Sequence, residues 1–256
     1  MKIFFQGKFS LAAGLLLAGW MWGAVFCCAG ETDPAQWNAS DFLYRVRNVP
    51  SRHSWALMTG SARHVRKGNR PVRCSLEMGI FFTPVQTLAQ IRFGGENEVY
   101  TVGQSYGKTG ATHVKSYCKK GYPQRIGVYG ITPEELAMSF LYWDLKKELP
   151  SDSVRGQTCR VFLLENKERT LLAKVSISKD YFFPVRAEFS ASSKPEKIFK
   201  TLEAAAFKRE NGYYFVSRIN LRGDQWSTQI RFDDLKAGAF EKKLPAGVFI
   251  KIPDGK

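Results

Sequence analysis

Two overlapping glycine motifs near residue 105 are the segments of this sequence most similar to a catalytic or nucleotide site. Residues 103–107 read Gly-Gln-Ser-Tyr-Gly, the pattern of a serine nucleophile on a turn between a strand and a helix. The residues that follow are a poor helix start, and no acidic residue lies between Ser105 and the one downstream histidine, His113. The adjoining Gly107-Lys108-Thr109 lacks the first glycine of a phosphate loop, because Val102 stands there. We interpret the segment as a hairpin turn and predict no catalytic residue.

Cysteine and histidine do not occur at the spacings of a metal site. Outside the leader described below, the cysteines are Cys74, Cys118 and Cys159, and the histidines are His53, His64 and His113. They form no Cys-x-x-Cys and no zinc-finger interval, so we predict no metal and no cofactor, and we interpret the histidines as surface or turn residues. Spacing leaves the disulfide connectivity open. We expect Cys74 to pair with Cys118, because both lie in the same strand-rich half.

The composition is that of a folded globular protein. The chain has 256 residues, 44% of them hydrophobic and 14% aromatic, with a net charge of +15. Such apolar content excludes a disordered chain, and the absence of heptads and of repeats of 20 to 50 residues excludes coiled coils and solenoids.

The first thirty residues predict export. Lys2 and Lys8 precede the nearly uncharged run from Leu11 to Phe26, and small residues at Ala29 and Gly30 precede an acidic segment. This is typical of a secretory signal cleaved near Gly30, which leaves residues 31–256 as a single periplasmic domain. A retained membrane anchor is the alternative, and a lipid-modified Cys27 or Cys28 fits the preceding residues poorly.

Basic residues are concentrated in two stretches without acidic residues, Phe42 to Leu76 and Val99 to Pro133. The basic residues of the first stretch are Arg45, Arg47, Arg52, Arg63, Arg66, Lys67, Arg70 and Arg73. Those of the second stretch are Lys108, Lys115, Lys119, Lys120 and Arg125. Export argues against nucleic acid, which leaves an acidic protein, an anionic membrane surface, or the charged faces of edge strands.

Two segments predict helices. Asn38, Ser40 and Asp41 favour a cap for a short helix that ends near Asn48, before Pro50. Thr132-Pro133-Glu134-Glu135 forms a capping box with proline at the first helical position, and this helix is expected to end near Leu149-Pro150.

Most of the remaining chain alternates apolar and polar residues with period two, which predicts strands with one wet face. The alternation runs through residues 53–118 and 153–234, and short turns between the runs favour antiparallel neighbours. We therefore predict an α+β fold, a curved, unclosed antiparallel β-barrel of about ten or eleven strands whose concave face is lidded by short helices.

Two short helices cannot fill the concave face of a wide sheet, so we predict a cavity for an apolar ligand. A sheet packed shut by its helices is the alternative. An aromatic set at Phe140, Tyr142, Trp143 and residues 181–183 is expected to supply part of the wall. The predicted ligand-binding residues are Phe140, Tyr142, Trp143, Val161, Leu163, Val175, Ile177, Phe183, Val185, Phe189, Trp226 and Ile230.

The order of these segments resembles one known family. The run from Gly130 to Asp144, the strand from Arg155 to Leu164, the segment from Phe183 to Glu188 and the final Leu244 to Phe249 are similar to the outer-membrane lipoprotein-sorting protein family over roughly residues 130 to 250. The resemblance implies a periplasmic carrier that shelters lipoprotein acyl chains or another lipid, collects them from an inner-membrane transporter and passes them to an outer-membrane receptor. An envelope-stress regulator or assembly partner that binds lipoprotein or an acidic protein surface is the alternative.

Overall fold

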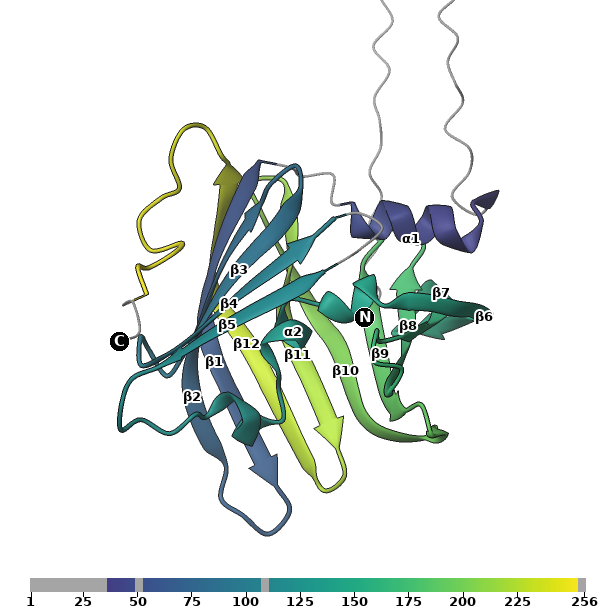
Figure 1. Ribbon diagram of the computed structural model, residues 1–256, viewed down its shortest axis with the longest axis horizontal. Coiled ribbons are helices and arrows are strands. Elements are labelled where there is room, and N and C mark those ends of the chain that lie inside the picture. The colour runs from purple at the N-terminus through teal and green to yellow at the C-terminus, as the bar shows by residue number, and fades with distance from the viewer. Residues whose placement is uncertain (1–35, 49–52, 107–110, 253–256) are drawn as a thin grey trace, which may run out of the picture. The chain divides into compact units, whose positions relative to one another are not determined.

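A strongly curved antiparallel sheet forms the body of the described chain (Figure 1). The structure is a computed structural model that describes residues 36–48, 53–106 and 111–252, all within one compact unit, Asp33–Lys256. The predicted leader, residues 1–30 with Cys27 and Cys28, lies outside the described residues.

The described residues form twelve strands in one sheet. The strands are β1 (Ser54–Arg66), β2 (Val72–Phe82), β3 (Gln86–Phe93), β4 (Glu98–Ser105), β5 (Thr112–Cys118), β6 (Asp144–Val154), β7 (Gln157–Glu165), β8 (Leu171–Ser178), β9 (Pro184–Ala191), β10 (Lys194–Glu210), β11 (Tyr213–Gly223) and β12 (Trp226–Ala239).

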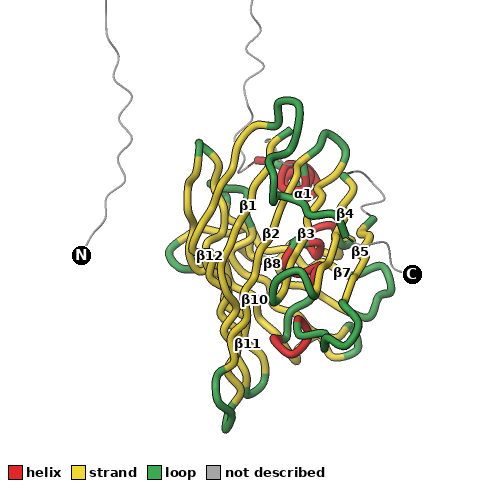
Figure 2. Tube along the Cα trace, turned by 90° about the vertical axis from the view of Figure 1, so that its left-hand side faces the viewer, coloured by secondary structure: helices red, strands yellow, loops and turns green. Residues whose placement is uncertain are grey.

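The chain order of the strands explains why the sheet stays open. The spatial order is β5-β4-β3-β2-β1-β12-β11-β10-β9-β8-β7-β6, so the first and last strands of the chain pair in the middle and β5 and β6 are the two edges. A segment with three short helical turns, η2 (Ile126–Tyr129), α2 (Pro133–Leu136) and η3 (Ser139–Tyr142), connects the two edges across the concave side (Figure 2). The predicted curved, unclosed antiparallel sheet with short helices is therefore confirmed, with twelve strands rather than ten or eleven.

The first predicted helix forms as α1 (Ala39–Arg47), and the backbone N–H of Asp41 donates to the Asn38 side chain at 2.9 Å. The side chains of Phe42, Leu43 and Val46 form its buried face. None of the helices in the described segments reaches the length and hydropathy that crossing a bilayer requires.

The second predicted helix is much shorter than expected. Its capping box is present, with the Glu135 N–H donating to Thr132 Oγ1 at 3.2 Å and the Thr132 N–H donating to Glu135 Oε2 at 3.1 Å. The helix ends at Leu136, Met138 adopts a left-handed φ of 55°, and the strand β6 begins at Asp144. The predicted end near Leu149-Pro150 is therefore wrong: pairing with β7 satisfies backbone groups along this stretch, and β6 is the strand that the sequence analysis did not include.

The core lies on the concave face. In β7 the side chains that face the core are those that the sequence pattern predicted to face outward. In β7 the side chains of Phe162 and Leu164 join the core, and Arg160 turns to the same face. The sequence pattern favoured Cys159, Val161 and Leu163 instead. Arg160 is tolerated there because its guanidinium lies 4.6 Å from the Phe42 ring centroid and forms an ion pair with Glu148 at 2.7 Å.

Candidate functional site: an apolar cavity under the helical crossover

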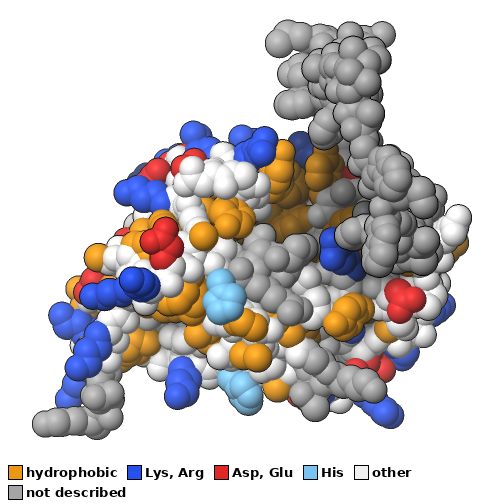
Figure 3. Space-filling model, turned by 90° about the horizontal axis from the view of Figure 1, so that it is seen from above, with side chains coloured by type: hydrophobic (Ala, Val, Ile, Leu, Met, Phe, Trp, Pro, Cys, Tyr) orange, Lys and Arg blue, Asp and Glu red, His pale blue; other side chains and the backbone are white. Residues whose placement is uncertain are grey.

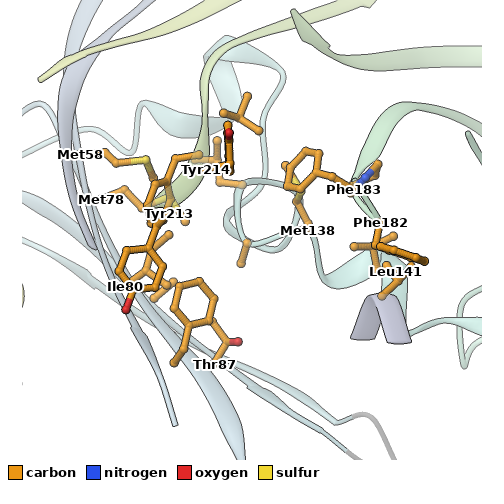
Figure 4. A pocket seen from close by; sticks show the side chains of 18 of the residues that line it. Met58, Met78, Ile80, Thr87, Met138, Leu141, Phe182, Phe183, Tyr213 and Tyr214 are labelled. Carbon is orange, nitrogen blue, oxygen red and sulfur yellow. The ribbon is translucent and has the colours of Figure 1, made fainter. Parts of the chain in front are cut away.

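A cavity of about 450 Å³ lies between the concave sheet and the α2–η3 crossover (Figure 4). One wall comes from β1, which contributes Met58, from β2, which contributes Met78 and Ile80, and from β3, which contributes Ala89. Met138 and Leu141 of the crossover form part of the opposite wall. The volume falls within the roughly 300–1,000 Å³ range of small-molecule sites.

The lining is mostly apolar. The residues that line the cavity are Arg45, Val46, Met58, Met78, Ile80, Phe82, Thr87, Ala89, Leu136, Ala137, Met138, Leu141, Tyr142, Tyr181, Phe182, Phe183, Pro184, Gly212, Tyr213, Tyr214, Phe215, Val216, Ile219 and Phe232. Arg45 is the one charged residue among these described lining residues. Three methionines contribute flexible, polarisable side chains that adapt to ligands of irregular shape. The cavity therefore suits an uncharged, apolar guest.

The mouth of the cavity, which we define by Arg45, Tyr181 and Tyr214, is open to solvent. The tyrosines are 64% and 61% exposed, high values for such large side chains. Figure 3 shows hydrophobic side chains around a recess on the upper face of the molecule. Tyrosine suits a boundary between an apolar interior and water, because its ring is apolar and its hydroxyl is polar.

The α2–η3 crossover covers the cavity, and we call it the lid. Hydrogen bonds between α1 and η3 hold it in place. Arg47 donates from Nε to the Leu141 carbonyl and from Nη2 to the Trp143 carbonyl, each at 2.7 Å. The Tyr142 hydroxyl donates back to the Arg47 carbonyl at 2.9 Å. Burial raises the pKa of the Tyr142 hydroxyl and lowers that of the Arg47 guanidinium. The contacts join two segments that lie almost a hundred residues apart in the chain.

A buried ion pair fastens the other side of the crossover. Glu135 of α2 pairs with Lys200 of β10, and both side chains are nearly buried. Lys200 also lies 5.5 Å from the ring centroid of Phe189. Glu135 thus has two roles, since its carboxylate also completes the capping box of α2.

The end of the sheet away from the mouth is packed shut by a group that we call the closed end: His64, Phe93, Tyr129, Trp226 and Thr228. Thr228 Oγ1 donates to the Tyr129 carbonyl at 2.6 Å, so it accepts the proton of His64 Nδ1 at 2.8 Å. The His64 ring lies 5.8 Å from both the Tyr129 and Trp226 rings. Burial, and next the charge of Arg66, lower the pKa of His64. His64 is therefore a core residue, and its interpretation as a surface or turn residue is wrong.

The cavity lies over a different part of the sheet than the sequence analysis predicted. Of the predicted ligand-binding residues, the structure places Tyr142 and Phe183 on the cavity wall. Phe140, Val175, Ile177, Phe189 and Ile230 are buried in the main core, and Trp143 and Trp226 pack against it. Two further members of the predicted aromatic set, Tyr181 and Phe182, also line the cavity.

Three of the predicted cavity residues do not belong to the concave face. Val161 and Leu163 lie outside the main core because β7 has the opposite phase. Val185 packs in a separate small cluster with Val154 and Cys159. It is an extra residue in β9, since Ser176 pairs with Arg186 while Ile177 pairs with Pro184. Such a bulge reverses the face that a period-two pattern predicts.

The cavity residues of β1–β3 and β11 were not predicted from the sequence. The relevant signal was present: Met78, Ile80 and Phe82 alternate along β2, and Tyr213 and Phe215 alternate along β11. These strands were assigned correctly, but periodicity does not reveal which part of the concave face the helices cover. Phe42 of α1 stacks on Phe162 at 5.6 Å, which fills the region where the cavity was expected.

The Cys74–Cys118 pairing is a second correction. Cys74, Cys118 and Cys159 are all free thiols. Cys74 lies on β2 and Cys118 ends β5, three strand spacings away, or about 14 Å along the sheet. A disulfide requires Cα atoms within about 7 Å. The Cys118 thiol instead donates to the Tyr122 carbonyl at 3.1 Å.

The two strands that flank the glycine motif at Ser105, β4 and β5, form an antiparallel pair, and Gly107 to Thr109 lie outside the described residues. Ser105 ends β4, its N–H donates to the Ala111 carbonyl at 3.1 Å, and the chain continues into the antiparallel strand β5. A nucleophile elbow requires a helix at this point. The described residues also contain no group of three or more His, Cys, Asp or Glu side chains that could hold a metal ion.

Comparisons with known proteins identify related folds. No family model matches the sequence, and no curated protein sequence matches it. A putative outer membrane lipoprotein-sorting protein domain from Vibrio parahaemolyticus has 15% identity and a TM-score of 0.59, over 82% of this chain and 96% of that one. A DUF1329 family protein from Desulfovibrio piger has 14% identity and a TM-score of 0.60, over 77% and 90%. A LolA superfamily protein from Nitrosomonas europaea has 14% identity and a TM-score of 0.50, over 84% and 98%. The chain therefore has the fold of these proteins, as its helix-and-strand order predicted.

Proposed function

We propose that this protein is a periplasmic, non-enzymatic carrier that shelters the acyl chains of a lipid or lipoprotein in the cavity. The observation that supports this proposal is the cavity itself. Its volume is about 450 Å³, and Arg45 is the one charged residue among its described lining residues. The fold shared with a lipoprotein-sorting domain supports the same class of function.

The energetics favour an acyl chain over a polar guest. Each buried methylene contributes about 0.8 kcal/mol, so a chain that fills the cavity gains many such increments. A charged ligand would lose its hydration and meet Arg45 as the one charged side chain among the described lining residues. The headgroup would remain at the mouth, where the tyrosine hydroxyls and the Arg45 guanidinium are exposed.

A carrier must also open. The lid is held by hydrogen bonds, one buried ion pair and the buried side chains of Leu136, Phe140 and Leu141, so opening has to expose this apolar surface, which a bound acyl chain would cover again. In this proposal an inner-membrane transporter loads the cavity and an outer-membrane receptor empties it.

The test is native mass spectrometry with lipid extraction on protein purified from the periplasm. Wild-type protein is expected to carry a diacyl lipid or a lipoprotein. The variant Phe215→Arg places a charge on the cavity wall, and we expect it to lose most of the bound lipid while remaining folded, because Phe215 is only half-buried.

Phe199→Arg is the matched control. Phe199 is 42% exposed on β10 and does not line the cavity, so this variant is expected to keep its lipid. An empty wild-type protein that also fails to take up an acylated peptide would refute the proposal. So would equal lipid content in the two variants.

A further inference from the structure

The two stretches without acidic residues, which lie far apart in the sequence, meet at the end of the sheet opposite the mouth. The turn between β1 and β2 lies beside the turn between β11 and β12, because the Lys67 N–H donates to the Gln225 carbonyl at 2.8 Å. The segment after β5 reaches the same end: the Lys119 N–H donates to the Asn97 carbonyl in the β3–β4 turn, also at 2.8 Å. The Gly94 N–H of that turn bonds the Ser75 carbonyl of β2 at 2.9 Å.

We call the resulting surface the basic end. Its exposed basic residues are Arg63, Arg66, Lys67, Arg70, Arg73, Lys119, Lys120, Arg125 and Arg222. Among the described residues, none of these nine takes part in an ion pair. The exposed acidic residues in the adjoining turns are Glu96 and Asp224. Glu98 is buried, where it accepts the backbone N–H groups of Arg125 and Ile126.

One pair of residues at the basic end works against the stability of the sheet. Arg63 of β1 lies directly across from Arg73 of β2 in the antiparallel register. Like charges at opposed positions repel and destabilise a sheet. Local conflicts of this kind are expected where a surface serves binding rather than stability.

We propose that the basic end is a docking surface for an acidic face of a protein partner, separate from the lipid cavity. Its position favours a protein over a bilayer. The mouth is formed near the opposite ends of the same strands, so a membrane contact at the basic end would hold the mouth away from the membrane. A protein contact there leaves the mouth free. Figure 1 also shows that the β1–β2 and β11–β12 hairpins project beyond the crossover, so a protein partner can contact them without reaching the mouth.

The experiment compares two charge-reversal variants of the full mature chain. The basic-end variant is Arg66→Glu, Lys67→Glu and Arg70→Glu, which keeps Gly68 with its left-handed φ of 82°. The control variant is Lys236→Glu, Lys242→Glu and Lys243→Glu, three exposed residues away from the basic end that change the net charge equally. The probes are a labelled poly-glutamate peptide, followed by fluorescence anisotropy at low and physiological salt, and vesicles of phosphatidylglycerol with phosphatidylethanolamine.

Wild-type protein is expected to bind the peptide, and the basic-end variant to bind it about tenfold or more weakly than the control variant. The lipid content of the basic-end variant should equal that of wild type, which separates this inference from the proposed carrier function. Equal weakening in both variants would overturn the proposal, because net charge alone would then explain binding. Vesicle binding that depends on the basic end, without peptide binding, would overturn it in favour of a membrane surface.

Discussion

The two ends of the curved sheet are built in opposite ways. At the closed end His64, Tyr129, Trp226 and Thr228 are locked by hydrogen bonds and ring contacts. At the mouth, Tyr181 and Tyr214 are largely exposed, and the cavity of about 450 Å³ lies beneath them. The same strands supply both ends. The contrast places ring contacts and buried hydrogen bonds at one end and the exposed rim of the cavity at the other, as the proposed carrier function requires.

The largest effect is expected from disturbing the closed end at Gly130. A Cβ there would lie 2.5 Å from Trp226 Cη2, and the backbone φ of 67° is unfavourable for an L side chain. Gly130→Ala should lower the free energy of unfolding by about 2–5 kcal/mol, through backbone strain and overpacking. Urea denaturation measures it.

The matched substitution is Gly127→Ala in the neighbouring turn, where a Cβ would meet no atom within 4 Å. This variant should be nearly neutral. A loss of stability equal to that of Gly130→Ala would contradict the assignment of the closed end as the rigid part.

A smaller effect is expected from loosening the lid at the mouth. Arg47→Met keeps the aliphatic stem but removes the bonds to the Leu141 and Trp143 carbonyls. We expect a loss of about 1–3 kcal/mol in stability and an increase in the binding of a hydrophobic dye to the more accessible cavity. Arg218→Met is the control, since Arg218 is exposed on β11 and does not line the cavity. Unchanged dye binding in Arg47→Met would show that these bonds do not hold the lid.

A further prediction concerns the pH dependence of stability, to which His64 at the closed end contributes. The pKa of His64 in the folded protein is lower than its ordinary value of 6.5, first because of burial and next because of Arg66. The unfolded chain therefore takes up a proton more readily, and stability falls as the pH drops below about 6.5. Burial raises the pKa of the contacting Tyr129 to about 12, so this hydroxyl does not titrate in that range.

His64→Asn retains a side-chain donor for Thr228 but does not titrate. We expect the difference in urea midpoint between pH 7.5 and pH 5.5 to be smaller in this variant than in wild type. An unchanged difference would assign the acid sensitivity to other groups.

The smallest effect is a difference in thiol reactivity. Burial raises the pKa of the Cys74 and Cys159 thiols, which lowers the fraction of reactive thiolate. Cys118, at the end of the edge strand β5, should therefore react first with a thiol reagent in the folded protein, as peptide mapping would show. If Cys74 and Cys118 became reactive only after reduction, the two would be disulfide-bonded, contrary to the structure.

The amino-acid sequence determined the local elements well. The Asn38 cap, the capping box at Thr132 and most strands follow from contacts between near neighbours in the chain, so the pattern of residues is sufficient to predict them. The pattern predicted the wrong face of a strand at two positions. Arg160 faces inward because it contacts the Phe42 ring and pairs with Glu148. Val185 faces outward because of a bulge in β9.

The location of the cavity and the existence of the basic end depended on the tertiary structure. Periodicity shows which side chains share a face of a strand, but the covering helices decide whether that face is filled or empty. Phe42 fills the region over β7, while the space over β1–β3 stays open beneath Met138. The two basic stretches likewise meet only because the sheet order brings the β1–β2 turn and the segment after β5 to the same end. The sequence by itself determined the curved sheet, its lid and the apolar character of its interior, because these follow from residue type and period. The packing of α1 and the crossover on the sheet, which depends on contacts between residues far apart in the chain, decided where the cavity lies.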